Sequence, residues 1–285
     1  MPPMDSSGTA LDADWLGACR AAVASLREIL REAPRTRERA VETGARGEGG
    51  DRTLVIDQAA EDAVFAQLDA LRAAGHRFTA VSEERGEVDY GDGGVRVVID
   101  PIDGSLNAKR LLGPVALSIA VADGPTMADV AFAFVHDFGS GEEWRATRGG
   151  GAFLDDVALD PALPERRGDS GKLELLGVEI ADPRWVAASI ERLEQETERL
   201  RVLGAIAVTM CQVAAARLDA MVSLRRCRAV DAAAAQLIVR EAGGHVAFPL
   251  CPDGPLSAPL DVAPHSPVLC ARSEATLARL ANVPA

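Results

Sequence analysis

The 285-residue sequence predicts an α+β protein, and three features of the chain predict this class. Two segments of helical periodicity come first, at residues 15–32 and from residue 57 onward. Short apolar segments separated by turn residues follow, which is typical of a mostly antiparallel sheet. Beyond residues 155–170, which are rich in Pro, Asp and Arg, strand and helix patterns alternate. We therefore expect an N-terminal α+β half at residues 1–155 and a C-terminal α/β half at residues 156–285.

The two N-terminal helices are predicted from the spacing of their apolar residues. In the first helix, apolar residues recur three or four positions apart, and Pro34 ends the pattern because proline does not continue a helix. The second helix begins near Asp57 and ends at Gly75. Residues 43–51, between the two helices, are rich in glycine and charge, so we expect a mobile loop there.

Turn residues separate the predicted strands of the first half. Gly124-Pro125-Thr126 lies between two apolar segments and predicts a hairpin. The predicted strands are residues 78–82, 95–99, 116–123, 127–138, 143–147 and 152–154. The second half is predicted to contain strands at residues 173–180, 219–224 and 268–271, and helices at residues 184–199, 206–217, 231–242 and 274–280.

Composition excludes several classes of function. A hydrophobic content of 48% is enough for a packed core, and a net charge of −13 argues against binding to nucleic acid or to an anionic membrane. No apolar stretch approaches the roughly 18 residues that a membrane span needs. The N-terminus lacks the basic region of a signal peptide, and the five cysteines are scattered. We expect a cytoplasmic protein with reduced thiols.

The most informative motif is the run VVIDPIDGS at residues 97–105. A β-branched strand ends in two carboxylates, Asp100 and Asp103, and the turn residue Gly104 and the hydroxyl of Ser105 follow at once. Mg²⁺ prefers oxygen ligands and binds through one or two carboxylates together with substrate phosphate. If a helix opens after Gly104, its N-terminal amides form an anion site. The motif therefore indicates metal-assisted phosphoryl chemistry.

Further acids occur where a metal site would need them. Asp57 lies near the start of the second helix, Glu83 and Glu84 follow an apolar strand, and Asp231 lies in the N-cap position of an alanine-rich helix. Each also has an ordinary structural interpretation: Asp57 and Asp231 could be helix caps, and the glutamates could form a solvated turn. A carboxylate at the end of a buried strand, such as Asp100, requires a partner. The occurrence of all five acids in one chain favours a functional site over these structural interpretations.

Together these segments resemble the inositol monophosphatase-like family of Mg²⁺-dependent, often lithium-sensitive phosphatases, a superfamily that includes fructose-1,6-bisphosphatases. The resemblance covers the chain from about Trp15 to the last helix. It is carried by Asp-Pro-Ile-Asp-Gly-Ser at residues 100–105, the upstream Glu-Glu pair, and Asp-Ala-Ala-Ala from Asp231. The pattern is closest to archaeal-type inositol monophosphatase/fructose-1,6-bisphosphatases. It implies a layered α/β/α/β/α sugar-phosphatase fold and commonly a homodimer.

The resemblance also implies a set of metal ligands for two or three Mg²⁺ ions. Glu83 resembles the family's bridging carboxylate, and Asp100 resembles the ligand that two metals share. The carbonyl group of Ile102 resembles a ligand of the first metal. Asp103 and Asp231 resemble ligands of the second metal.

The remaining roles concern water and phosphate. Asp57 and Ser105 resemble the pair that orients the attacking water, and Glu84 resembles the neighbour of the bridging glutamate. The N–H groups of Gly104 and Ser105 would hold the phosphate group. Residues 44–52 resemble the segment that recruits a third, weaker metal.

Two departures from the family pattern concern the substrate. Leu224 replaces a glutamate that binds sugar hydroxyls in inositol-specific members, and Val230 replaces a tryptophan. Arg225 and Arg226 lie in the same stretch and suit a second anionic group on the substrate, although they also suit a solvated rim.

The expected activity is Mg²⁺-dependent hydrolysis of a phosphate monoester on a small polyol or sugar. Two alternatives remain open at this point. One is a 3′-phosphoadenosine 5′-phosphate or histidinol-phosphate phosphatase, and the other is a non-catalytic, metal-binding regulatory homologue.

Overall fold

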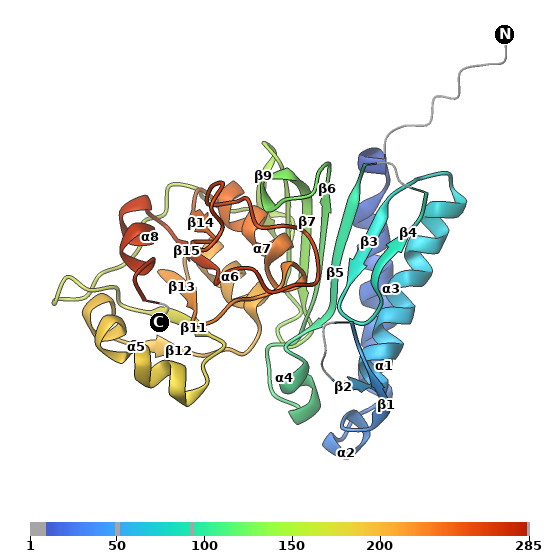
Figure 1. Cartoon of the computed structure of the whole chain (residues 1–285), viewed down its shortest axis with the longest axis horizontal. Helices are drawn as coiled ribbons and strands as arrows, with labels where there is room; N and C mark the ends of the chain where they lie inside the picture. The colour runs from blue at the N-terminus through green and yellow to red at the C-terminus, as the bar shows by residue number, and fades with distance from the viewer. Residues whose placement is uncertain (1–9, 49–51, 92–93, 284–285) are drawn as a thin grey trace, which may run out of the picture.

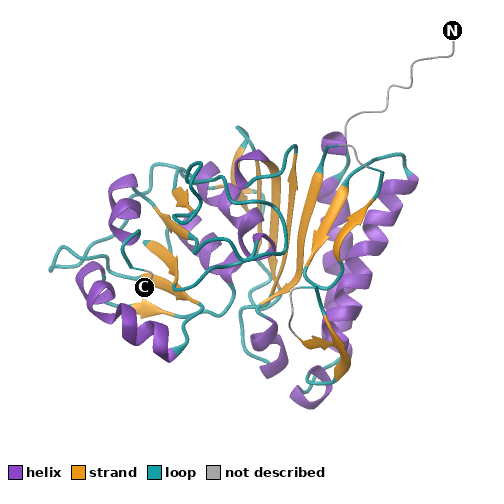
Figure 2. Ribbon diagram, viewed as in Figure 1, coloured by secondary structure: helices purple, strands orange, loops and turns teal. Residues whose placement is uncertain are grey.

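The chain folds into five alternating layers of helices and sheets, which confirms the predicted α+β class and its layered arrangement. The computed structural model describes residues 10–48, 52–91 and 94–283. The layers in Figure 1, from right to left, are helices α1 and α3, an eight-stranded sheet, helices α6 and α7, a five-stranded sheet, and helices α5 and α8. Figure 2 shows that each sheet has helices on both faces.

The first layer consists of the two predicted N-terminal helices. Helix α1 (Trp15–Glu32) has the predicted bounds, and α3 (Val55–Ala73) begins two residues before Asp57. Asp14 caps α1 by accepting a hydrogen bond from the amide of Gly17 at 2.9 Å. The buried face of α1 carries the apolar residues that predicted it: Trp15, Cys19, Ala22, Val23, Leu26 and Leu30.

The eight-stranded sheet is antiparallel except for the pair β3 and β5. Its order is β10 (Val157–Ala158), β9 (Gly151–Leu154), β8 (Glu143–Thr147), β7 (Val130–Asp137), β6 (Ala116–Ala122), β5 (Arg96–Asp103), β3 (Thr79–Ser82) and β4 (Gly86–Asp89). Side chains alternate between its faces, since Val97 and Ile99 pack toward α1 and α3 whereas Val98 packs toward α6 and α7. Both faces are covered, which explains the continuous apolar run before the motif.

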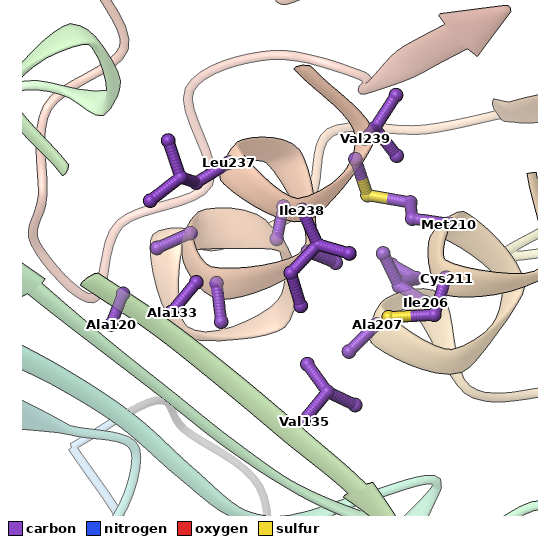
Figure 3. Close-up of a cluster of buried hydrophobic side chains, with 14 of the residues drawn as sticks. Ala120, Ala133, Val135, Ile206, Ala207, Met210, Cys211, Leu237, Ile238 and Val239 are labelled. Carbon is purple, nitrogen blue, oxygen red and sulfur yellow. The ribbon is translucent and has the colours of Figure 1, made fainter. Parts of the chain in front are cut away.

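The middle layer joins the two sheets. It consists of α6 (Ile206–Ala214) and α7 (Ala229–Glu241), and ten residues of α7 are buried. Figure 3 shows Ile238 of α7 beside Ala133 and Val135 of the sheet, with α6 on the other side. The alanines of α7 have small side chains, which lets its backbone pack closely between its neighbours.

The five-stranded sheet and its outer helices complete the fold. The strand order is β12 (Leu200–Arg201), β11 (Leu176–Glu179), β13 (Ala220–Ser223), β15 (Leu269–Ala271) and β14 (His245–Ala247). Helices α5 (Pro183–Glu196) and α8 (Glu274–Leu280) pack on the face of this sheet opposite α6 and α7.

The structure corrects one loop prediction and adds elements that the sequence patterns did not indicate. Residues 43–51 are predicted to form a mobile loop, but the described part forms a hairpin of β1 (Glu42–Arg46) and β2 (Arg52–Leu54), and residues 49–51 lie outside the described residues. The loop prediction is wrong there because backbone pairing does not require apolar side chains: all five residues of β1 are exposed. The added elements are short, and they comprise α2 (Thr36–Arg39), β4, β10, β12, β14 and two 3₁₀ turns, Ala10–Asp12 and Met127–Asp129.

The largest apolar cluster contains residues from both predicted halves of the chain, among them Val135 and Ile238. The division of the chain into two halves near residue 155 therefore stays a prediction, and the two predicted halves share one apolar core. None of the helices in the described ranges is long and apolar enough to cross a membrane.

Candidate active site

A cleft of about 960 Å³ opens between the two halves of the chain at the end of the motif strand β5. Its walls come from the end of β5, the turn after β3, the N-terminal ends of α3, α6 and α7, and the end of β11. The acids that line it include seven central ones: Asp57, Glu83, Glu84, Asp100, Asp103, Glu179 and Asp231. The fold thus brings the acids of four predicted segments to one place: Asp57, the pair Glu83 and Glu84, the motif pair Asp100 and Asp103, and Asp231.

An irregular step in strand β5 directs the two motif carboxylates into the cleft. Asp100 pairs with Ser118 of β6, but Asp103 pairs with Ala116, so β5 contains one extra residue between them. Proline lacks an amide hydrogen, so Pro101 cannot continue the ladder there. The amide of Ile102 donates to Asp100 Oδ1 at 3.0 Å.

A short helix follows the motif strand directly. Gly104 adopts φ +89°, and α4 (Ser105–Arg110) begins after it. A side chain is excluded at Gly104, because a Cβ atom would lie 2.9 Å from the carbonyl oxygen of Pro114. The hydroxyl of Ser105 donates to the Ile102 carbonyl at 2.9 Å, which fixes the turn beside the carboxylates.

Asp103 connects the two halves of the molecule. Its carboxylate accepts hydrogen bonds from the amides of Ile206 at 3.1 Å and Ala207 at 2.8 Å, at the N-terminus of α6. The positive end of the helix dipole favours a negative charge at this point. Asp103 therefore belongs to the first sheet by sequence and is held by the second half of the chain.

Asp57 and Asp231 are both third residues of their helices and have the same local role. Asp57 Oδ2 accepts from the amide of Leu54 at 3.3 Å, and Asp231 Oδ2 accepts from the amide of Arg228 at 2.8 Å. The prediction that Asp231 is an N-cap is wrong, because α7 begins at Ala229 and Arg228 takes the cap position. Each aspartate caps its helix with one oxygen, and both side chains line the cleft. Asp57 Oδ1 is buried without a hydrogen-bond partner among the described residues.

The glutamate pair after β3 connects to both sides of the cleft. Glu84 accepts a hydrogen bond from the hydroxyl of Thr53, which joins it to the β1–β2 hairpin. Glu83 accepts from the guanidinium of Arg228 at 2.6 Å. Ser82, the last residue of β3, is bonded to the buried Glu61 of α3, which anchors the turn from behind.

Burial raises the pKa of the acids in the cleft. Desolvation raises the pKa of Asp57 to about 6 and that of Glu83 to about 7, and Arg228 opposes the shift at Glu83. Desolvation also raises the pKa of Asp100 and Asp103 well above the usual range, and the neighbouring carboxylates add to it. Several buried carboxylates in one cleft repel one another, so a bound cation would stabilise their charged forms.

The donor set suits a hard cation. It consists of oxygen atoms, among them four carboxylates and the Ile102 carbonyl, and Asp57 Oδ1 is buried without a protein donor. In the described part of the chain, no three His, Cys, Asp or Glu side chains are arranged closely enough to hold a metal ion as they stand. The guanidinium of Arg228 lies against two of the acids, Glu83 and Asp231.

The two arginines predicted to bind substrate lie in different places. Arg226 lines the cleft, as do the predicted phosphate-binding residues Gly104 and Ser105. Arg225 instead stacks on Trp185 of α5, 4.1 Å from the ring centroid. Leu224 is buried in the core beneath the second sheet and does not line the cleft.

Sequence reasoning missed one acid of the cleft and one ion pair within it. Glu179, at the end of β11, is buried and accepts hydrogen bonds from the amides of Leu203 and Gly204 and the hydroxyl of Thr209. The signal was present, because Glu179 follows a short apolar strand just as Asp100 does. The ion pair joins Glu83 to Arg228, which lies in the same arginine-rich stretch as Arg225 and Arg226; it spans 145 positions and leaves no local pattern.

Comparison of this chain with known proteins identifies the class of protein to which it belongs. The inositol monophosphatase family model matches residues 13–283. A fructose-1,6-bisphosphatase/inositol-1-monophosphatase of Methanothermobacter thermautotrophicus is 33% identical over 211 residues, which are 70% of this chain and 72% of the relative. The Nus factor SuhB of Escherichia coli is 33% identical over 210 residues, 73% of this chain and 75% of the relative. A crystal structure of an inositol monophosphatase–fructose 1,6-bisphosphatase superposes with a TM-score of 0.79 at 24% identity, covering 95% of this chain and all of the other.

The fold and these relatives define the class of protein, a phosphoric monoester hydrolase. Within that class, the chain belongs to the inositol monophosphatase family, as the sequence resemblance predicts.

Proposed function

We propose that this protein hydrolyses a phosphate monoester on a small polyol or sugar and that it uses two or three Mg²⁺ ions to do so. The observation that carries the proposal is the meeting of Glu83, Asp100, Asp103 and Asp231 in one cleft beside the amides of Gly104 and Ser105. The relatives that are fructose-1,6-bisphosphatase/inositol-1-monophosphatases support this substrate class.

Five groups would hold the metal ions: the side chains of Glu83, Asp100, Asp103 and Asp231, and the Ile102 carbonyl. When bound, Mg²⁺ acidifies a water molecule and neutralises charge on the phosphoryl group. Asp100 and Asp103 are buried, which strengthens the electrostatic interactions that their carboxylates make.

The other residues of the cleft orient the reactants. Asp57 lines the cleft and its Oδ1 atom is buried without a hydrogen-bond partner among the described residues, so it would accept a hydrogen bond from the attacking water together with Ser105. Glu84 holds the β1–β2 hairpin beside that water through Thr53. The amides of Gly104 and Ser105 would bind the phosphate oxygens, and Arg226 would meet a second anionic group on the substrate.

The experiment is phosphate release with and without Mg²⁺ from a panel of four esters: inositol 1-phosphate, fructose 1,6-bisphosphate, 3′-phosphoadenosine 5′-phosphate and histidinol phosphate. Fast, metal-dependent turnover of one sugar or polyol ester supports the proposal. Preference for either of the last two esters would move the assignment to that substrate. Size-exclusion chromatography with light scattering on the same sample tests the homodimer that the resemblance implies.

Some relatives of this chain are described as Nus factor SuhB, so a non-catalytic, metal-binding regulatory role is the second candidate function. If this chain binds Mg²⁺ in a calorimeter but releases no phosphate from any of the four esters, the proposal of an active sugar phosphatase fails. A metal-binding regulatory homologue would then be the better assignment.

A further inference from the structure

A permanent positive charge lies inside the acidic cleft. Arg228 precedes α7, and its guanidinium crosses the cleft to Glu83, in the turn after β3, with Nη1 2.6 Å from Oε1. Its Nη2 atom lies 3.4 Å from Oδ1 of Asp231. The three side chains are 20%, 14% and 13% exposed, respectively, so solvent screens these ion pairs only partly.

The charge of Arg228 cannot be removed by a change of pH in the physiological range, since a guanidinium does not deprotonate in proteins. Its acidic neighbours Glu83, Asp231 and Asp100 raise its pKa further, against the opposing effect of burial. Arg228 therefore compensates negative charge contributed by three separate elements, namely the turn after β3, strand β5 and helix α7.

The contacts of Arg228 use oxygen atoms that a metal ion would need. Glu83 Oε1 and Asp231 Oδ1 both face the guanidinium, whereas Asp231 Oδ2 is already used to cap α7. A cation that takes Glu83 Oε1 or Asp231 Oδ1 as a ligand must displace the guanidinium from that oxygen atom. Two positive charges cannot occupy the same pair of carboxylates without strong repulsion.

We infer that Arg228 is an internal counter-ion that competes with the metal for Glu83 and Asp231, so that it weakens metal binding and stabilises the cleft when no metal is bound. The inference rests on the proposed function, because it concerns the same carboxylates. It adds a positioning residue that sets the metal concentration at which the site fills.

The test is calorimetric titration of Mg²⁺, and separately Mn²⁺, into chelator-treated wild-type protein and two variants. Arg228→Met removes the charge and keeps an unbranched side chain of moderate length. Arg225→Met is the matched control, because it removes the same charge three residues away, where the guanidinium stacks on Trp185 outside the cleft. We expect Arg228→Met to bind metal on the order of tenfold more tightly and Arg225→Met to stay within about twofold of the wild type.

Thermal unfolding gives a second readout that does not depend on activity. In chelator, Arg228→Met is expected to melt below the wild type, because Glu83, Asp100 and Asp231 lose their counter-ion. At saturating metal the difference should shrink, since binding to the folded state alone stabilises it by mass action and the tighter binder gains more. If Arg228→Met does not fold, Arg228→Gln serves instead, because it also removes the charge and keeps a polar side chain, and the same outcomes are expected of it.

The outcomes separate this inference from the proposed function. If the wild type binds neither cation and the variant also binds none, the proposed metal site fails and the inference fails with it. If the wild type binds metal and Arg228→Met binds it equally or more weakly, the inference is overturned while the proposed function stands. In that case Arg228 orients the ligands and does not compete with the metal.

Discussion

Glu179 gives the sharpest prediction about how the second half of the chain supports the cleft. Its carboxylate accepts from the Leu203 amide at 3.1 Å, from the Gly204 amide at 3.1 and 3.2 Å, and from the Thr209 hydroxyl at 2.6 Å. The side chain is buried, and burial raises the pKa of Glu179 while the three donors oppose that shift. One carboxylate therefore holds the turn that leads into α6.

The expected cost of Glu179→Gln follows from these contacts. Hydrogen bonds to a charged group contribute about 1 kcal/mol more than neutral ones, so three of them give a loss of about 3 kcal/mol in the free energy of unfolding. For a chain of this size, that lowers the melting temperature by about 6–12 °C. Thr209→Val removes one of the three bonds and should cost about 1 kcal/mol.

The assay is thermal and urea-induced unfolding of the wild type, Glu179→Gln, Thr209→Val and the control Glu174→Gln, whose side chain is exposed at the other end of the same segment. A melting temperature of Glu179→Gln within about 2 °C of the control would refute the reasoning. Because this turn leads directly into the α6 residues whose amides hold Asp103, Glu179→Gln should also lower kcat/KM at a temperature where it remains folded.

Three further outcomes are expected. Asp100→Asn should abolish phosphate release while thermal unfolding shows an intact fold; normal turnover would contradict the proposed ligand set. Arg226→Ala should reduce kcat/KM for a bisphosphate more than for a monophosphate, whereas Arg225→Ala should affect neither strongly, because Arg225 lies on Trp185. Equal losses of kcat/KM on both substrates would contradict the proposal that Arg226 binds a second anionic group. Gly104→Ala should lower stability by about 2 kcal/mol or more, because φ is +89° and the added Cβ meets the Pro114 carbonyl; an unchanged melting curve would argue against that strain.

The sequence predicted those parts of the fold that are determined by local pattern. Apolar spacing gave the bounds of α1 exactly and those of α3 within about two residues, and turn residues located the main strands. The β1–β2 hairpin was missed because all five residues of β1 are exposed and carry no apolar pattern, so that its pairing with β2 depends on backbone groups. The contact between Arg228 and Glu83 could not be predicted from spacing, since it depends on how α7 lies between the two sheets.

Asp57 and Asp231 can be helix caps and members of the functional site at the same time, and the structure shows why. Asp57 and Asp231 each cap a helix with one carboxylate oxygen, and both side chains line the cleft. Removing either carboxylate would therefore weaken a helix and the site at the same time, and lost activity alone could not separate the two effects. Asp100 has no such helix to cap, since it lies within strand β5 and accepts only the local amide of Ile102 in the contacts described. Loss of turnover in Asp100→Asn with unchanged stability would thus report on the chemistry of the cleft rather than on its framework.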